Sequence, residues 1–435
     1  MTTSFLAGLV LIGGFILLML FKIPVSFAML MATLGSAMVT GTNFSVIVRQ
    51  MVDGANNFSL LSIPFFIVMG EFMSAGGISE KIVNLANLAV GRFRGGLAYV
   101  NVLDSMFFGG ISGSAVADVS SLGTMVIPMM VKQGYDEDFA VGLTVTTACQ
   151  GVLIPPSHNM VIYALAAGGG VSIGTLFMAG MLPGMALGLG MIIMCLLMAK
   201  RYNFPKGTGV AKGEGKRVLM EGILPMMTLV IIMVGTGAGV FTATEASAIA
   251  CVYTMILSLI VFRSVKISEI GQVIKNSLKT LAIVMTLLAT AKGFAYMMTE
   301  LRIPGAISNA LLSVTDNKYV LLLIINVLLL ALGCFMDMAP LITIMTPILL
   351  PVVTSVGVDP VHFGVIMIFN LAVGLCTPPV GSALFVGCAI GKTPIERTAK
   401  NMLPLYAVMV IVLLLVTYIP DIALILPKLL MGYGG

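Results

Sequence analysis

The sequence is poor in charge: Asp, Glu, Lys and Arg make up only 9% of its 435 residues, whereas hydrophobic residues make up 59%. A soluble domain carries roughly a quarter of its residues as charges, so this composition excludes that class. The formal net charge of +5 comes from basic residues in short loops between apolar runs, which is typical of membrane topology and not of nucleic-acid binding. We therefore predict an integral membrane protein that contacts the lipid bilayer and binds no nucleic acid.

Cysteine and histidine are also sparse, with six and two residues. The cysteines are scattered through apolar stretches without a Cys-x-x-Cys pair or a Cys/His cluster, so we interpret them as small core residues and expect no transition-metal site. The sequence has no Walker motif, no Gly-x-Ser-x-Gly and no His-Glu-x-x-His. These motifs carry common catalytic chemistries, so we expect no enzyme activity and no cofactor.

Lys and Arg are absent from the first 21 residues, which therefore lack the charged start of a cleaved secretory signal. We expect this segment to be the first membrane span.

What the sequence does contain is a repeated break in apolar sequence. Residues 151–156 and 374–379 each begin with glycine and end with a proline pair, 223 positions apart. The same offset pairs Gly110 with Gly333, Pro128 with Pro351, Gly134 with Gly357 and Asp136 with Asp359. Broken backbone within a membrane is tolerated only where it is buried in protein or lines a polar cavity. Paired breaks in two halves of a chain indicate the binding site of a transporter.

Apolar runs divide the chain into two halves with the same order of segments. The first half, residues 1–205, has predicted spans near 5–21, 24–41 and 55–76, an amphipathic stretch 78–90, an interrupted pair 97–131, a broken span 138–167 and a span 181–199. The second half, residues 218–435, has predicted spans near 218–237, 243–262 and 280–298, an amphipathic stretch 303–313, an interrupted pair 318–356, a broken span 360–391 and a span 403–427. Residues 206–217 are the predicted cytoplasmic linker.

Each interrupted pair could be one bent span or a re-entrant hairpin, and the basic residues favour the hairpin. If the hairpins do not cross, each half crosses the membrane five times and both termini lie on one side. With the termini outside, only five of the 23 Lys and Arg residues fall outside the cytoplasmic loops, as the positive-inside rule requires: Arg49, Arg302, Lys318, Lys428 and, within a span, Lys292. Since five is odd, the predicted fold is all-α with two inverted repeats, and the hairpin tips meet near the midplane.

Neutral polar residues lie near the tips and the breaks. Unpaired carbonyls at helix ends suit a hard cation, whereas free N–H groups and helix N-termini suit a carboxylate. Hydroxyls and amides can hold a carboxylate without a permanent charge, and the candidates are Ser112, Ser114, Ser157, Asn159, Asn370, Thr377 and Ser382. The alternatives are that the prolines only kink their helices and that Ser and Thr only bond the preceding turn.

Ionisable residues at membrane depth cost at least ~2.5–3.5 kcal/mol for Asp or Lys at a helix centre. The candidates are Glu71, Asp104, Asp118, Glu245, Lys292 and Asp337. The three aspartates lie within the predicted hairpins, where they could tune ion binding or pair with a helix cap or a basic neighbour. We interpret Lys292 as a structural or interface charge and His158, beside the first proline pair, as a hydrogen-bonded packing residue.

Four motifs, residues 57–66, 109–115, 154–157 and 336–340, resemble the large membrane subunit of tripartite ATP-independent periplasmic (TRAP) transporters, and the resemblance covers essentially the whole chain. It implies sodium-driven uptake of an organic acid across a bacterial inner membrane by an elevator-type transporter. It also implies two partners, a small membrane subunit and a periplasmic substrate-binding protein. The small subunit is expected to be a separate chain, because no additional span precedes residue 5 or follows residue 427.

The resemblance also implies two sodium sites, with sodium as the only metal. The family's second-half site falls on Gly333, Gly374, Thr377 and Val380, largely through carbonyl oxygens. Inverted symmetry suggests a first-half site at Gly110, Gly151, Ile154 and Ser157. Ile154 stands opposite Thr377, so its side chain offers no ligand and only its carbonyl remains. The expected substrate pocket comprises Ser112, Ser114, Asn159, Asn370 and Ser382.

Two other interpretations stay open at this point: a stand-alone elevator-type carboxylate transporter, and a membrane scaffold or channel whose breaks serve gating. The sequence does not identify the acid, which could be a dicarboxylate, a keto acid, a sugar acid or a sialic acid. The number of sodium ions and the oligomeric state are equally undetermined.

Overall fold

The computed structural model describes residues 2–201, 204–207, 209–210, 213–315 and 317–434. The described chain is built from helices, and its isolated β-bridge pairs Arg94 with Lys206. Among the described residues, eight helices are long and apolar enough to span a membrane, or up to ten if each of two bent pairs is one span. The prediction of an all-α membrane protein is confirmed.

The described first half ends with α11. Its helices are α1 (Thr2–Leu20), α2 (Val25–Thr40), α3 (Phe44–Ala55), the 3-10 turn η1 (Phe58–Leu61), α4 (Ser62–Ala75), α5 (Ile78–Val90), α6 (Gly96–Ser112), α7 (Ala115–Lys132), α8 (Glu137–Ala148), α9 (Gln150–Leu153), α10 (His158–Ala166) and α11 (Ile173–Arg201).

The described second half begins with α12. Its helices are α12 (Gly215–Gly237), α13 (Ala243–Ile256), the π-turn η2 (Leu257–Val261), the 3-10 turn η3 (Ile267–Glu269), α14 (Ile270–Glu300), α15 (Ile303–Val314), α16 (Lys318–Gly333), α17 (Met338–Ser355), α18 (Pro360–Leu375), α19 (Ser382–Gly391), α20 (Ile395–Asn401), α21 (Leu403–Tyr418) and α22 (Asp421–Met431).

Three details differ from the sequence-based segments. The amphipathic helix α3 was not expected, because Arg49, Gln50 and Asp53 interrupt its apolar run. The last predicted span, 403–427, is divided into α21 and α22 near Pro420, and the short α20 precedes it. Glu245 forms a capping box with Thr242 at the start of α13, so it satisfies a helix end.

Both interrupted pairs are helix-turn-helix units. Between α6 and α7 the chain turns at Gly113, whose φ of 62° is accessible to glycine without a Cβ penalty, and Ser114 then caps α7;. Between α16 and α17 the chain turns through residues 334–337, and Asp337 caps α17. The length and apolarity of α7 and α17 would also allow a full span, so the re-entrant path stays a prediction.

The two predicted broken spans lie at the centre of the molecule. Nearly every side chain of α8 and α18 is buried, as expected for helices that are apolar on all sides. The chain leaves helical conformation between α9 and α10 and between α18 and α19, and the proline pairs lie in these breaks with cis peptide bonds. The Cys149 thiol donates to the Ala372 carbonyl at 3.0 Å, so the two breaks lie beside each other.

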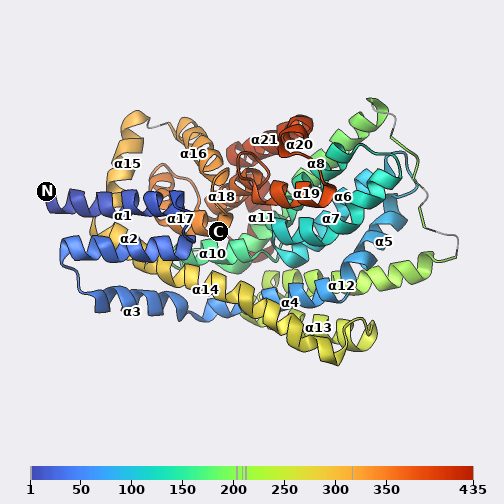
Figure 1. Cartoon of the computed structure of the whole chain (residues 1–435), viewed down its shortest axis with the longest axis horizontal. Helices are drawn as coiled ribbons and strands as arrows, with labels where there is room; N and C mark the ends of the chain where they lie inside the picture. Colours follow the sequence, from blue (N-terminus) through green and yellow to red (C-terminus); the bar gives the residue numbers. More distant parts are fainter. Residues whose placement is uncertain (1, 202–203, 208, 211–212, 316, 435) are drawn as a thin grey trace.

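The remaining helices surround this centre (Figure 1). Helices α1, α2 and α3 lie toward one end of the molecule, α5, α6, α7 and α12 toward the other, and α14 runs between the two groups. Helix α1 exposes large apolar side chains, such as Phe5 and Leu20 at 75% and 76%. That exposure fits a helix facing lipid, since a water-soluble protein would bury these residues.

Candidate functional site

A cavity of about 790 Å³ lies where the two hairpins and the two breaks meet. Among the helices of the hairpins and breaks, four contribute their starts to its lining, through Ala115 of α7, His158 of α10, Met338 of α17 and Ser382 of α19. Each helix N-terminus carries unpaired N–H groups and a partial positive charge. Four of them around one cavity make a site suited to an anion.

Charged side chains at this cavity are few. Among the described lining residues there is no Lys or Arg, and the acidic ones are Glu71 and Asp337. The imidazole of His158 is a third ionisable group in the lining. The backbone dipoles of the helix N-termini therefore provide the attraction for an anion, because no lysine or arginine side chain in the described lining could neutralise it;.

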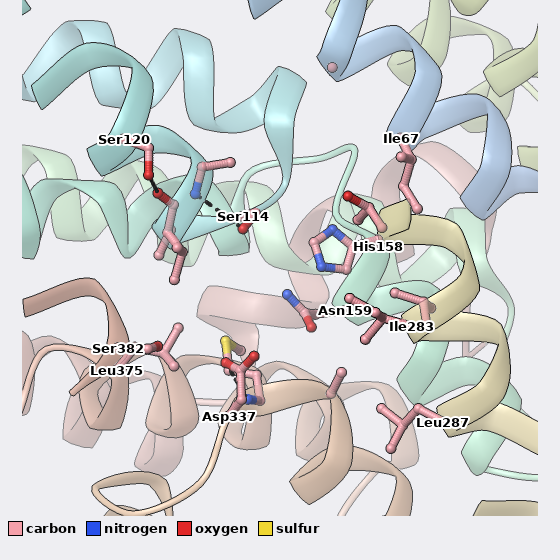
Figure 2. A pocket seen from close by; sticks show the side chains of 18 of the residues that line it. Ile67, Ser114, Ser120, His158, Asn159, Ile283, Leu287, Asp337, Leu375 and Ser382 are labelled. Atoms are coloured by element: carbon pink, nitrogen blue, oxygen red, sulfur yellow. Dashed lines mark hydrogen bonds between the residues drawn. The ribbon is translucent and has the colours of Figure 1, made fainter. Parts of the chain in front are cut away.

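Figure 2 shows how the polar side chains are arranged. Ser114 and His158 lie on the side of the first half, Asp337 and Ser382 lie opposite, and Asn159 projects between them. Ser114 accepts a hydrogen bond from the amide of Ala117. The polar groups of both halves thus face the same space.

An apolar wall closes the cavity on the side of the long helices. Ile67 of α4 and Ile283 and Leu287 of α14 line it (Figure 2). Helix α2 contributes its first residues, including Ser26, and α14 contributes Thr280. The cavity therefore lies at the boundary between the hairpin-and-break centre and the long helices around it.

The structure brings together most of the predicted pocket residues. Ser114, Asn159 and Ser382 line the cavity. Asn370 instead donates hydrogen bonds to the backbone carbonyl and side-chain oxygen of Asn326 on α16, at 2.9 and 2.7 Å, and is not a lining residue. The side chain of Ser112 lies outside the described residues.

The residues of the predicted first sodium site are close together. Gly109 and Gly151 touch backbone to backbone, so a Cβ on either would collide with the Cα of the other. A Cβ on the neighbouring Gly110 would lie 2.9 Å from the Ile154 side chain and 3.1 Å from the Pro155 carbonyl oxygen. The turn of the hairpin therefore packs directly on the break, as the paired glycines suggest.

Ser157 is the one residue with a polar side chain among the four of the predicted first sodium site. It precedes α10, and its hydroxyl oxygen is buried without a hydrogen-bond partner among the described residues. A buried hydroxyl without a partner is costly, so this atom is available to a ligand.

The predicted second site shows the same close approach. A Cβ on Gly374 would lie 2.7 Å from the Gly333 Cα. The Val380 amide donates to the Cys334 carbonyl at 3.2 Å, which ties the break to the hairpin. The Thr377 hydroxyl donates to the Val373 carbonyl at 2.8 Å, so only its lone pairs are left for a cation.

Helix C-termini meet at both places. Gly109 and Gly151 lie in the last turns of α6 and α9, and Gly333 and Gly374 in the last turns of α16 and α18. C-terminal turns carry unpaired carbonyls and a partial negative charge. The metal-ligating groups at each contact would thus be backbone carbonyl oxygens, with a side-chain hydroxyl nearby. These oxygen ligands fit a hard cation such as sodium.

The hairpin carboxylates take different positions. Asp337 caps α17, with its carboxylate accepting from the Met338 amide at 3.0 Å, and it also lines the cavity. Asp104 and Asp118 are buried inside the first hairpin and are not lining residues. Lys292 lines a second, separate cavity of about 340 Å³.

Sequence reasoning missed most of the contributions from outside the hairpins and breaks. The sequence marks Glu71 only as an ionisable residue at membrane depth, and it gives no reason to single out Ser26 or Thr280. No motif marks them, because they reach the cavity only through the packing of α2, α4 and α14 against the centre. The sequence did indicate that Asp337 and His158 lie near the pocket, since Asp337 lies at the tip of a predicted hairpin and His158 lies beside the first proline pair.

Comparison with known protein families gives a match over nearly the whole chain. The family described as the tripartite ATP-independent periplasmic transporter, DctM component, matches residues 12–422. The chain is 37% identical over 426 residues to the sialic acid TRAP transporter large permease protein SiaM of Vibrio cholerae, covering 97% of this chain and 99% of that protein. It is 37% identical over 379 residues to the C4-dicarboxylate TRAP transporter large permease protein DctM of Pseudomonas aeruginosa, covering 87% and 88%.

Solved structures show the same fold at low sequence identity. The YdaH transporter of Alcanivorax borkumensis matches with a TM-score of 0.65 and 12% identity, over 86% of this chain and 87% of that one. MtrF of Neisseria gonorrhoeae matches with a TM-score of 0.59 and 12% identity, over 85% and 83%.

Proposed function

The chain belongs to the DctM family, the large permease components of TRAP transporters, and from this premise we propose that it carries an organic acid together with sodium ions through the cavity between its hairpins. Large permeases of this family work with a small membrane subunit and a periplasmic binding protein. The named relatives serve sialic acid and C4-dicarboxylates, so the cargo class is an organic acid.

The observation that carries this proposal is the electrostatic character of the cavity. Four helix N-termini attract a carboxylate, yet none of the described lining residues is Lys or Arg, and Glu71 and Asp337 add negative charge. An anion in a low-dielectric site needs charge compensation. Cations that bind with the acid supply it, which is the physical basis for coupling.

Sodium ions would bind where helix C-termini meet, at the Gly109–Gly151 and Gly333–Gly374 contacts. There, carbonyl oxygens supply the ligands, together with Ser157 in the first site and Thr377 and the Val380 backbone in the second. A bound ion would hold each hairpin turn against its break and so keep the helix N-termini aimed into the cavity. One net positive charge moving inward yields about 2.3 kcal/mol per 100 mV of membrane potential, which can drive uptake.

The proposed architecture is a pair of inverted repeats with elevator-type motion, in a bacterial inner membrane with both termini periplasmic. The equivalent glycine contacts and proline breaks of the two halves support it. In this topology the start of α2, the end of α4 and the first half of α14 lie toward the cytoplasm. These segments border the cavity, which supports an inward-facing state.

Reconstituted uptake tests the function. Proteoliposomes containing this chain and its small subunit, supplied with the loaded binding protein, are expected to accumulate the acid only with an inward sodium gradient. Replacing sodium with choline at the same ionic strength is the matched control. Uptake by this chain alone would favour the stand-alone transporter, and rapid flux without saturation would favour a channel.

A further inference from the structure

The second cavity, of about 340 Å³, has an unused polar lining. It lies between α3, the second half of α14, the end of α10 and the middle of α17. Lys292 lines it together with Gln50, Asp53 and Asn57. Within the described part of the chain, no hydrogen bond or ion pair to Lys292 is formed, and Asp53 does not reach it within 4.0 Å.

One face of α14 lines both cavities. Thr280, Ile283, Val284 and Leu287 border the hairpin cavity, and Leu288, Ala291, Lys292 and Ala295 border the second one. Spacings of three and four residues place these side chains on a single stripe along the helix. The two cavities therefore lie one after the other along the same face of α14.

The same two centre helices contribute to both cavities. Helix α10 lines the hairpin cavity with Asn159 and the second cavity with Ile162, and α17 does so with Pro340 and Thr343. Ile283 and Lys292 are nine positions apart in the sequence, which corresponds to roughly 14 Å at 1.5 Å per helical residue. A shift of this size along α14 would bring the hairpin cavity level with Lys292.

The two cavities differ in the charges of their lining residues. The hairpin cavity in its present position borders Glu71 on α4 and Asp337, with no Lys or Arg among its described lining residues, whereas the lining of the second cavity carries both the ammonium group of Lys292 and the carboxylate of Asp53, which do not pair with each other. An ammonium group attracts an organic anion, and a carboxylate repels it. This asymmetry favours capture at the second cavity and release beside Glu71.

We propose that the second cavity is the outer receiving site for the carboxylate of the transported acid, with Lys292 as its binding residue. In the predicted topology this end of α14 faces the periplasm, where the binding protein delivers its cargo. Lys292 holds the carboxylate until the hairpin cavity is level with it and takes the acid up. The inference rests on the proposed function, since it takes the cargo to be an organic anion.

The test compares Lys292→Met and Lys292→Arg in proteoliposomes with the small subunit and the loaded binding protein. Lys292→Met is expected to lower the maximal uptake rate about tenfold or more, the loss typical of a charge-assisted hydrogen bond. The binding-protein concentration at half-maximal rate should not change, because the site acts after docking. Lys292→Arg, which retains the charge, should restore most of the rate.

Lys279→Met is the matched control, because Lys279 lies on α14 but is not a lining residue of either cavity. Its uptake should equal that of the unmodified chain. Lys292→Met with an unchanged maximal rate would overturn the receiving site, and so would a variant that raises only the required concentration of binding protein, which would indicate a docking residue. Absence of sodium-dependent uptake by the unmodified chain would instead contradict the proposed function.

Discussion

At the scale of single residues, Ser157 is the clearest test of the first sodium site. Its hydroxyl oxygen is buried and has no hydrogen-bond partner among the described residues. Ser157→Ala therefore removes no protein hydrogen bond, and in sodium-free buffer we expect a thermal midpoint close to that of the unmodified chain. Added sodium should raise the midpoint of Ser157→Ala less than that of the unmodified chain. Ion binding stabilises the folded state by mass action, and the loss of one ligand weakens sodium binding about tenfold.

The measurement is the midpoint of thermal unfolding in detergent as a function of sodium concentration, with choline holding the ionic strength constant. Ser277→Ala is the control: its hydroxyl is also buried but donates to the Val273 carbonyl at 3.0 Å within α14. It should lower the midpoint at every sodium concentration alike. Identical sodium titrations for Ser157→Ala and the unmodified chain would show that Ser157 is not a ligand.

At the scale of elements, the start of α7 combines a structural and a functional role. Ser114 caps this helix and lines the cavity. Ser114→Ala is expected to lower the free energy of unfolding by about 1 kcal/mol through the lost cap. It should also raise the acid concentration needed for half-maximal binding, because a hydroxyl facing the anion is lost.

A second cap separates these two effects. Thr242 caps α13 with its side chain accepting from the Glu245 amide at 3.2 Å, and it does not line the cavity. Thr242→Ala should therefore cost a similar stability while leaving acid binding unchanged, as measured by thermal unfolding and by acid-dependent stabilisation. Equal binding by the Ser114 and Thr242 variants would mean that the α7 N-terminus does not hold the carboxylate.

At the scale of the whole molecule, the proposed inverted topology predicts that the two ends of α14 lie on opposite sides of the membrane. Glu300 is the last residue of α14 and is predicted to lie outside, whereas Glu214, directly before α12, is predicted to lie inside. In a Cys334→Ala background, which removes the one cysteine that is not buried, a membrane-impermeant maleimide should label Glu300→Cys in spheroplasts. Glu214→Cys should be labelled only after permeabilisation.

This labelling pattern depends on the number of crossings between the two positions. The prediction has three, through α12, α13 and α14, so an odd number separates them. Labelling of both variants in intact spheroplasts, or of neither, would contradict the topology. Lys216→Cys, in the first turn of α12, serves as a second inner position and should behave like Glu214→Cys.

Part of this molecule could be predicted from the sequence because its signals are local. Long apolar runs require helices, Gly113 and Ser114 mark a turn followed by a helix start, and the proline pairs cannot continue a hydrogen-bonded helix. The residue types at the glycine contacts were likewise predictable, since two backbones approach closely only where side chains are absent. Helix α3 was missed because its polar residues obscure a short apolar face.

The sequence by itself therefore determined the helical class, the two-fold repetition of hairpin and break, and the family. Only the tertiary structure decided that the N-termini of α7, α10, α17 and α19 surround one cavity, that Asn370 pairs with Asn326 and does not line this cavity, and that α14 lines both cavities. The physical reason is that helix ends are set by neighbouring residues, whereas their convergence depends on packing between segments more than two hundred positions apart. Such long-range contacts have no signature in composition or periodicity.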